Sequence, residues 1–111
     1  MTHYSIKRLA DMLLDHCIPF ELTTDAMGND RNQIWYPSHD KSVCDVICCD
    51  GTYGYEHGLL EIMGLLTKEE SEIDSVVGWL TPEEVFERIW RHWFDNHEQI
   101  LVTMAGKNNN Y

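Results

Sequence analysis

Two strong helix-start signals occur in the second half of the chain and limit what can lie between them. Thr67-Lys68-Glu69-Glu70 fits a capping box, in which the Thr hydroxyl and the second Glu carboxylate satisfy amides that the first helical turn leaves without partners. Thr81-Pro82-Glu83-Glu84 is stronger, because proline loses no hydrogen bond there and the acids lie at the positive end of the helix dipole. These signals predict a short helix to about Ile73, a strand over Ser75–Leu80, and a long helix over Pro82 to about Asn96.

The first half of the chain predicts one helix followed by short strands. Ser5–His16 has apolar residues in the i, i+3, i+4 rhythm and charged residues on its other side, which is typical of an amphipathic helix. Val43–Cys49 is an apolar, β-branched run and is the best candidate for a central strand. Phe20–Thr24 and Gln33–Tyr36 are expected to form a hairpin. Leu59–Met63 fits a strand or a helix by periodicity, and its flanking glycines favour a strand paired with the preceding one.

The order of these elements favours an α+β domain. We expect an antiparallel sheet of four to five strands with an N-terminal helix, a short middle helix and a longer C-terminal helix. The length of 111 residues fits one domain, over 1–105, and the Asn-rich residues 106–111 are expected to form a flexible tail.

The charge balance restricts the classes of partner. The chain has 19 acidic and 8 basic residues, a formal net charge of −11. This argues against direct binding to nucleic acid or to anionic membrane, because both need Lys and Arg, and it permits a basic protein partner. Net charge also serves simply to keep a small protein soluble. The sequence has neither a membrane-length apolar stretch nor a signal peptide, so we expect a cytoplasmic protein with reduced cysteines.

Acid placement is the most distinctive feature of the sequence. Between Glu61 and Glu87 there are eight acids against Lys68 alone. The i, i+4 spacing of Glu83 and Glu87 places carboxylates about 6 Å apart on one helix face, a spacing similar to that of nucleic-acid phosphates. Capping and solubility explain each acid singly, whereas the cluster as a whole suggests a binding surface. The predicted binding residues are Glu69, Glu70, Glu72, Asp74, Glu83 and Glu87.

A loop rich in glycine and tyrosine is an alternative site. It contains Tyr53, Tyr55 and His57, with Asp50 and Glu56 as neighbouring acids. Functional groups are concentrated in loops, so this segment suggests a small ligand-binding module or an enzyme. A bulged hairpin connection would have the same composition.

The cysteines leave a third alternative. Cys44 and Cys48 should share one strand face, with Cys49 on the other, and His39 or His57 would have to complete a zinc site. Buried reduced thiols are the more common outcome for such residues, and Cys17 lies elsewhere in the chain. No metal ligand set is therefore assigned, and no cofactor is predicted because the chain lacks a phosphate-binding motif.

Two segments carry a resemblance to known proteins. Gly58-Leu59-Leu60-Glu61-Ile62-Met63-Gly64-Leu65-Leu66-Thr67 and the residues from Val76 to Ile89 resemble small acidic proteins encoded by phages and mobile elements of Gram-positive bacteria. The resemblance implies a phage-associated protein in the cytoplasm of a bacterial host cell, and it implies no activity. Small acidic phage proteins include inhibitors of host defence such as anti-CRISPR proteins.

The leading hypothesis is therefore a protein-binding protein whose partner is a host protein with a basic surface. Its sharper form is an inhibitor that acts as a nucleic-acid mimic in the basic channel of a CRISPR effector.

Overall fold

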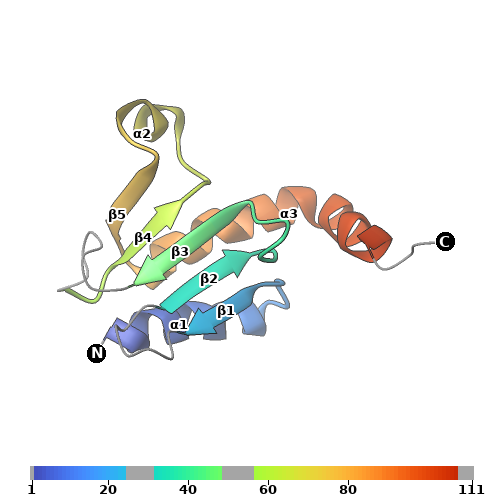
Figure 1. Cartoon of the computed structure of the whole chain (residues 1–111), viewed down its shortest axis with the longest axis horizontal. Coiled ribbons are helices and arrows are strands. Elements are labelled where there is room, and N and C mark those ends of the chain that lie inside the picture. The colour runs from blue at the N-terminus through green and yellow to red at the C-terminus, as the bar shows by residue number, and fades with distance from the viewer. Residues whose placement is uncertain (1, 25–31, 49–56, 108–111) are drawn as a thin grey trace.

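The computed structural model describes residues 2–24, 32–48 and 57–107. Its elements in chain order are α1 (Thr2–Asp15), β1 (Glu21–Thr24), β2 (Asn32–Tyr36), β3 (Cys44–Cys48), β4 (Leu60–Met63), α2 (Lys68–Ile73), β5 (Val76–Leu80) and α3 (Pro82–Lys107). The five strands form one antiparallel sheet in the order β1-β2-β3-β4-β5 (Figure 1). The expected α+β fold is confirmed, including the middle helix and the strand between the two helix-start signals.

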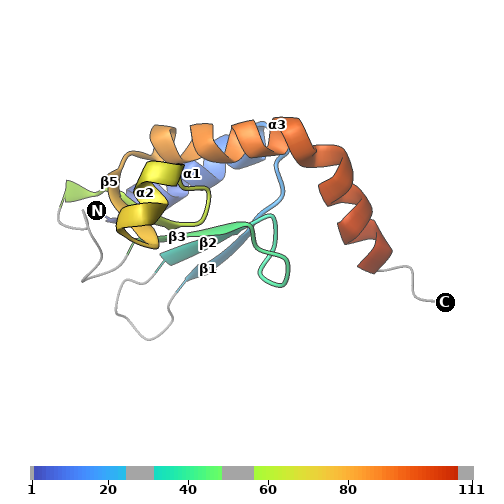
Figure 2. The same cartoon turned by 90° about the horizontal axis from the view of Figure 1, so that it is seen from above.

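Two helices and one face of the sheet enclose the core. α1 and α3 lie on the same side of the sheet and contact each other (Figure 2). The strand register places Leu22, Ile34, Val46, Ile62 and Val77 in one row across all five strands. Leu9 and Leu13 of α1 and Val85 and Ile89 of α3 complete the buried cluster. Because residues two apart on a strand share a face, β3 also directs Cys44 and Cys48 into this core, as predicted.

The end of α1 follows a known helix-termination pattern with an unusual residue. The amide of Ile18 donates to the carbonyl of Leu13 at 2.9 Å, and the amide of Cys17 donates to the carbonyl of Leu14 at 3.0 Å. This pair of bonds is the Schellman motif, which requires a left-handed residue after the helix. Cys17 takes that conformation, with φ of 57°, at a position that usually belongs to glycine.

α3 is longer than the sequence indicated. Its helical backbone continues past the expected end near Asn96 to Lys107, two residues into the segment expected to be a tail. Residues 108–111 lie outside the described part of the chain. The distal half of α3 bends and extends beyond the sheet (Figure 2). In the described ranges, no helix combines the length and apolar composition needed to cross a bilayer.

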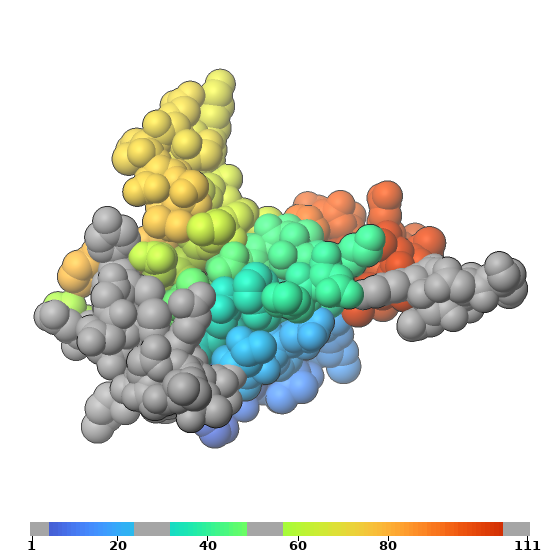
Figure 3. Space-filling model, in the orientation of Figure 1, coloured from blue at the N-terminus to red at the C-terminus, as the bar shows by residue number. Residues whose placement is uncertain are grey.

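The connection between β4 and β5 forms an arm that projects from the body. α2 lies at the outer end of this arm, in yellow in the space-filling view (Figure 3). The arm begins at Gly64, whose φ is 97°. A side chain at this position would place its Cβ 2.4 Å from the carbonyl oxygen of Val43, so only glycine fits against the start of β3.

Candidate functional site

α2 is a helix that is held in place without burying any of its residues. Its start is a complete capping box: the amide of Glu70 donates to Thr67 Oγ1 at 3.1 Å, and the amide of Thr67 donates to Glu70 Oε1 at 2.9 Å. Helices this short are unstable in isolation, because nucleation fixes several residues for each hydrogen bond gained. With no buried residue in α2, its attachment to the body has to come from polar contacts.

Arg88 of α3 provides that attachment. Its Nη1 and Nη2 atoms donate to Glu70 Oε1 at 2.8 Å and to Glu70 Oε2 at 2.7 Å, and Nη1 also donates to the carbonyl of Leu65 at 3.0 Å. Both side chains are partly buried, and paired bonds between a guanidinium and a carboxylate are among the strongest in proteins. The hydrogen bonds from Arg88 and from the Thr67 backbone lower the pKa of Glu70 to about 2. The bond to Glu70 likewise raises the pKa of Arg88.

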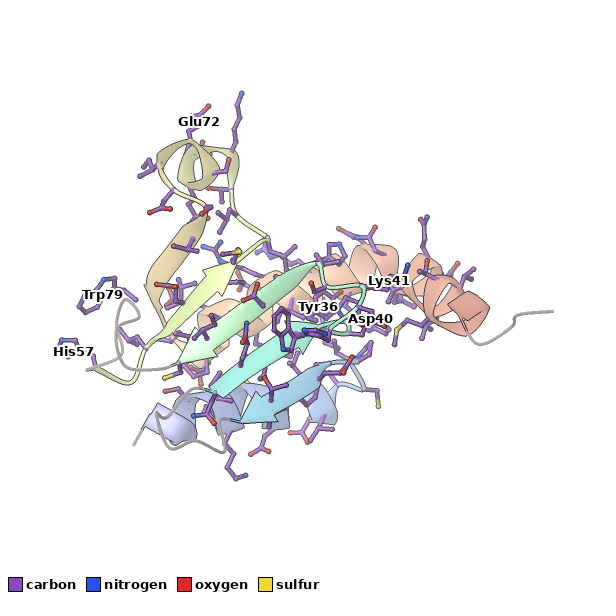
Figure 4. The ribbon with its side chains drawn as sticks, viewed as in Figure 1. Tyr36, Asp40, Lys41, His57, Glu72 and Trp79 are labelled. Carbon is purple, nitrogen blue, oxygen red and sulfur yellow. The ribbon has the colours of Figure 1, made fainter. Side chains whose placement is uncertain are left out.

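The other acids of α2 face outward. Glu69, Glu72 and Asp74 are exposed, and Figure 4 shows Glu72 at the outer end of the helix. Asp74 ends the helix, with its Oδ1 accepting from the amide of Ser75 at 2.6 Å. Ile73 lies among these acids with 87% of its surface exposed. α2 therefore presents a largely exposed apolar side chain between two exposed acids in the sequence, Glu72 and Asp74, with Glu69 one turn earlier.

The two predicted binding acids of α3 do not lie with this group. Glu83 Oε2 accepts from Nε of Arg8 on α1 at 2.5 Å, and this bond lowers the pKa of Glu83. Glu87 forms an exposed ion pair with Arg91 one turn along α3. The structure therefore brings four of the six predicted acids together, namely Glu69, Glu70, Glu72 and Asp74. Of these, Glu70 is bound to Arg88 of the same chain.

Of the three residues of the alternative site, His57 is the one within the described part of the chain. Tyr53 and Tyr55 lie outside the described residues. His57 is exposed and packs against the ring of Trp79, with ring centroids 5.3 Å apart (Figure 4). None of the three pockets found along α3 is lined by His57.

Trp79 has an unusual backbone. The register between β4 and β5 shifts, because Leu60 faces Leu80 whereas Ile62 faces Val77. The extra residue in β5 makes a β-bulge, and bulges redirect side chains. Trp79 has φ of 61°, a left-handed conformation that is rare for a bulky residue, and 57% of its surface is exposed.

A small apolar pocket lies where α3 passes the β2–β3 connection. Its volume is about 200 Å³, and its walls include Pro37, Val43 and Ile100, with Lys41 among the polar residues lining it. His92 also lines this pocket, and its Nδ1 is 2.8 Å from the hydroxyl of Tyr36. Burial lowers the pKa of His92 and raises the pKa of Tyr36.

The thiols and histidines do not form a visible metal centre. Across residues 2–24, 32–48 and 57–107, no three or more His, Cys, Asp or Glu side chains are placed to hold a metal ion. Cys49, one of the four cysteines, lies outside these ranges. Burial raises the pKa of Cys44 to about 12, so this thiol is protonated at neutral pH.

Sequence reasoning did not identify Arg88 as the residue that holds α2, because its partner lies on another element. Trp90 follows the fully buried Ile89 in the sequence, yet 38% of its own surface is exposed.

Comparison with known proteins gives no relative: no family model matches the chain, and no curated protein or solved structure is significantly similar to it.

Proposed function

We propose that this chain is a protein-binding protein that uses α2 to present an acidic surface to a basic partner. The observation that carries the proposal is the construction of the arm. Arg88 and the capping box hold a helix with no buried residue away from the body, and this leaves Ile73 exposed beside Glu69, Glu72 and Asp74. An exposed apolar residue within a charged rim is a common arrangement in protein interfaces.

The contributions of the predicted acids then differ. Glu70 positions the helix, because its carboxylate is engaged by Arg88 and by the Thr67 amide. Glu83 joins α3 to α1 through Arg8. In this proposal Glu69, Glu72 and Asp74 contact the partner directly. Ile73 is the apolar anchor. Glu87 contributes to the negative field from α3. The net charge of −11 would speed the encounter with a basic surface, and added salt would slow it.

The sharper form of the proposal is an inhibitor of host defence in a bacterial cell. In that form the carboxylates of α2 take the place of nucleic-acid phosphates in the basic channel of an effector such as a CRISPR nuclease. The resemblance to small acidic phage proteins and the density of acids support this form. The exposed pair His57 and Trp79 is the single observation that favours the alternative of a small ligand-binding module.

A pair of charge-reversed variants tests the proposal. Glu69→Lys with Glu72→Lys reverses two charges on α2, and Asp11→Lys with Asp15→Lys reverses two exposed charges on α1. Both double variants change net charge equally, so they separate a local surface from the overall field. Each protein is used as bait in a lysate of a Gram-positive bacterium, and bound proteins are identified by mass spectrometry.

We expect basic proteins that bind the intact chain and the α1 variant but not the α2 variant. A nucleic-acid-guided nuclease among them would support the sharper form, and inhibition of its DNA binding can then be measured directly. Equal capture by both variants would contradict the assignment of the binding surface to α2.

A further inference from the structure

α3 carries a second apolar stripe beside the side that packs on its own core. Phe94, Leu101 and Trp90 are 64%, 51% and 38% exposed. The rings of Trp90 and Phe94 stack with their centroids 5.2 Å apart, so the two residues form one continuous surface. Single exposed apolar residues are normal on proteins, whereas several on one helix mark a site of contact.

The spacing of the stripe matches a helix-pairing seam. Trp90, Phe94, His97, Leu101 and Met104 alternate steps of four and three residues, which is the a/d pattern of heptad repeats. His97 and Met104 are partly exposed, so they continue the stripe at the edge of the packed side. The core contacts of α3 come from other residues, chiefly Val85 and Ile89. The helix therefore has one apolar side for its own core and another that the described residues leave exposed.

Charges beside the stripe indicate which charge its binding partner carries. Glu87, Asp95 and Glu98 are exposed along one flank, against Arg91 alone. Arg91 already pairs with Glu87 at 3.4 Å, so this flank has an excess of negative charge. A second copy of this chain would bring the same charges and a further net charge of −11, whereas a basic helix would neutralise them.

We propose that this stripe docks an amphipathic helix of another protein, with apolar residues in heptad spacing on one face and Lys or Arg beside them. The apolar face packs on Trp90, Phe94 and Leu101, and the basic residues lie against Glu87 and Glu98. This surface is separate from α2, and the inference holds whether or not α2 binds a partner.

A synthetic peptide tests this proposal with the full chain. The probe is a helix-forming peptide of about 21 residues, three heptads, with leucine at the a and d positions and lysine at most others. Its control has the same composition in scrambled order, so charge is matched and the apolar face is lost. Binding is measured by titration calorimetry at low and at physiological salt.

Variants of the protein locate the contact. Phe94→Ser with Leu101→Ser removes the centre of the stripe, and Leu14→Ser with Met63→Ser removes two apolar residues elsewhere whose exposure, 63% and 48%, is similar to that of the stripe pair. Circular dichroism confirms that each variant is folded. We expect the stripe variant to bind the heptad peptide about tenfold more weakly or worse, and the control variant to bind within about twofold of the intact chain. Glu87→Lys with Glu98→Lys should also weaken binding and reduce its salt dependence.

Three outcomes would overturn the proposal. Equal affinity for the heptad and scrambled peptides would show that net charge alone drives binding. An unchanged affinity of the stripe variant would place the contact elsewhere. Sedimentation equilibrium that finds a dimer of the intact chain and a monomer of the stripe variant would show that a second copy occupies the surface.

Discussion

Arg88 of α3 and Glu70 of α2, which are 18 positions apart in the sequence, form two parallel hydrogen bonds of 2.8 and 2.7 Å between guanidinium and carboxylate. The same carboxylate completes the capping box of α2 by accepting from the Thr67 amide. One side chain therefore both starts the helix and attaches it to the body. The orientation of the projecting arm depends on this pair, because α2 has no buried residue to hold it.

Removal of the guanidinium should release the arm. We expect Arg88→Ala to destabilise α2 by about 2 kcal/mol, since hydrogen bonds to charged groups contribute about 1.5–3 kcal/mol each and a released arm regains some solvation. Hydrogen exchange of the amides in 68–73 should become at least about tenfold faster, with little change in the sheet. Arg91→Ala is the control, because its pair with Glu87 is exposed and contributes about 0–1 kcal/mol. Equal protection of α2 in both variants would contradict the role of Arg88.

The stability of the arm should depend on pH through Glu70. The pKa of this carboxyl falls from its ordinary value of 4.5 to about 2 in the folded chain, chiefly because Arg88 donates to it. Between these values the unfolded chain binds a proton that the folded chain does not, so stability falls as the pH is lowered from 4.5 to about 2. Glu70→Gln removes this ionisation. Above pH 4.5 the intact chain should have a larger free energy of unfolding than Glu70→Gln, measured by urea titration. This difference in free energy should shrink towards pH 2. A difference that is constant with pH would refute this assignment.

The backbone at Trp79 should favour glycine over alanine. On an ordinary strand, glycine is less stable than alanine by about 0.5–1 kcal/mol. Trp79 has φ of 61°, where an alanine Cβ is strained and glycine is not. We therefore expect Trp79→Gly to be more stable than Trp79→Ala by about 1 kcal/mol, although both lose the same ring contact with His57. Chemical denaturation measures the difference, and the ordinary order of the two variants would show that the left-handed bulge is absent.

The buried hydroxyl of Tyr36 should contribute measurably to stability. It lies 2.8 Å from His92 Nδ1, and burial lowers the pKa of this histidine, which favours the neutral ring that shares the bond. Tyr36→Phe keeps the packing of the ring and leaves the histidine nitrogen without this partner. We expect a loss of about 1–2 kcal/mol in the free energy of unfolding at neutral pH. His92→Phe in combination with Tyr36→Phe is the control, because it removes both partners of the bond. The double variant should lose less than the sum of the single losses if the two groups interact.

Local signals in the sequence predicted most of the fold. The helix-start signals at Thr67 and Thr81 act within one helical turn; both helices begin as expected, and at Thr81 too the contacts form a capping box. The alternation in β3 depends only on neighbouring residues, and it correctly placed Cys44 and Cys48 on one face. The expected end of α3 near Asn96 was wrong by 11 residues, about three helical turns. The apolar run Ile100–Met104, which lies in this continuation, was the local signal for an extension of the helix.

The candidate surface was predicted only in part. The sequence indicated that acids are concentrated between residues 61 and 87, and it could not distinguish those that face solvent from those with internal partners. Glu70 pairs with a residue 18 positions away and Glu83 with one 75 positions away. Such distances along the chain exceed the range over which helix or strand periodicity relates two residues.

The sequence by itself determined where helices and strands begin, which of their faces are apolar, and that the chain has a large negative charge. These properties follow from interactions between residues within about four positions of each other, and from composition. Only the tertiary structure decided which carboxylates are engaged by arginine, that α2 stands away from the core, and that Trp79, Trp90 and Phe94 remain exposed. The reason is physical: whether a charge is paired or an apolar ring is covered depends on which distant segments the folded sheet and helices bring into contact.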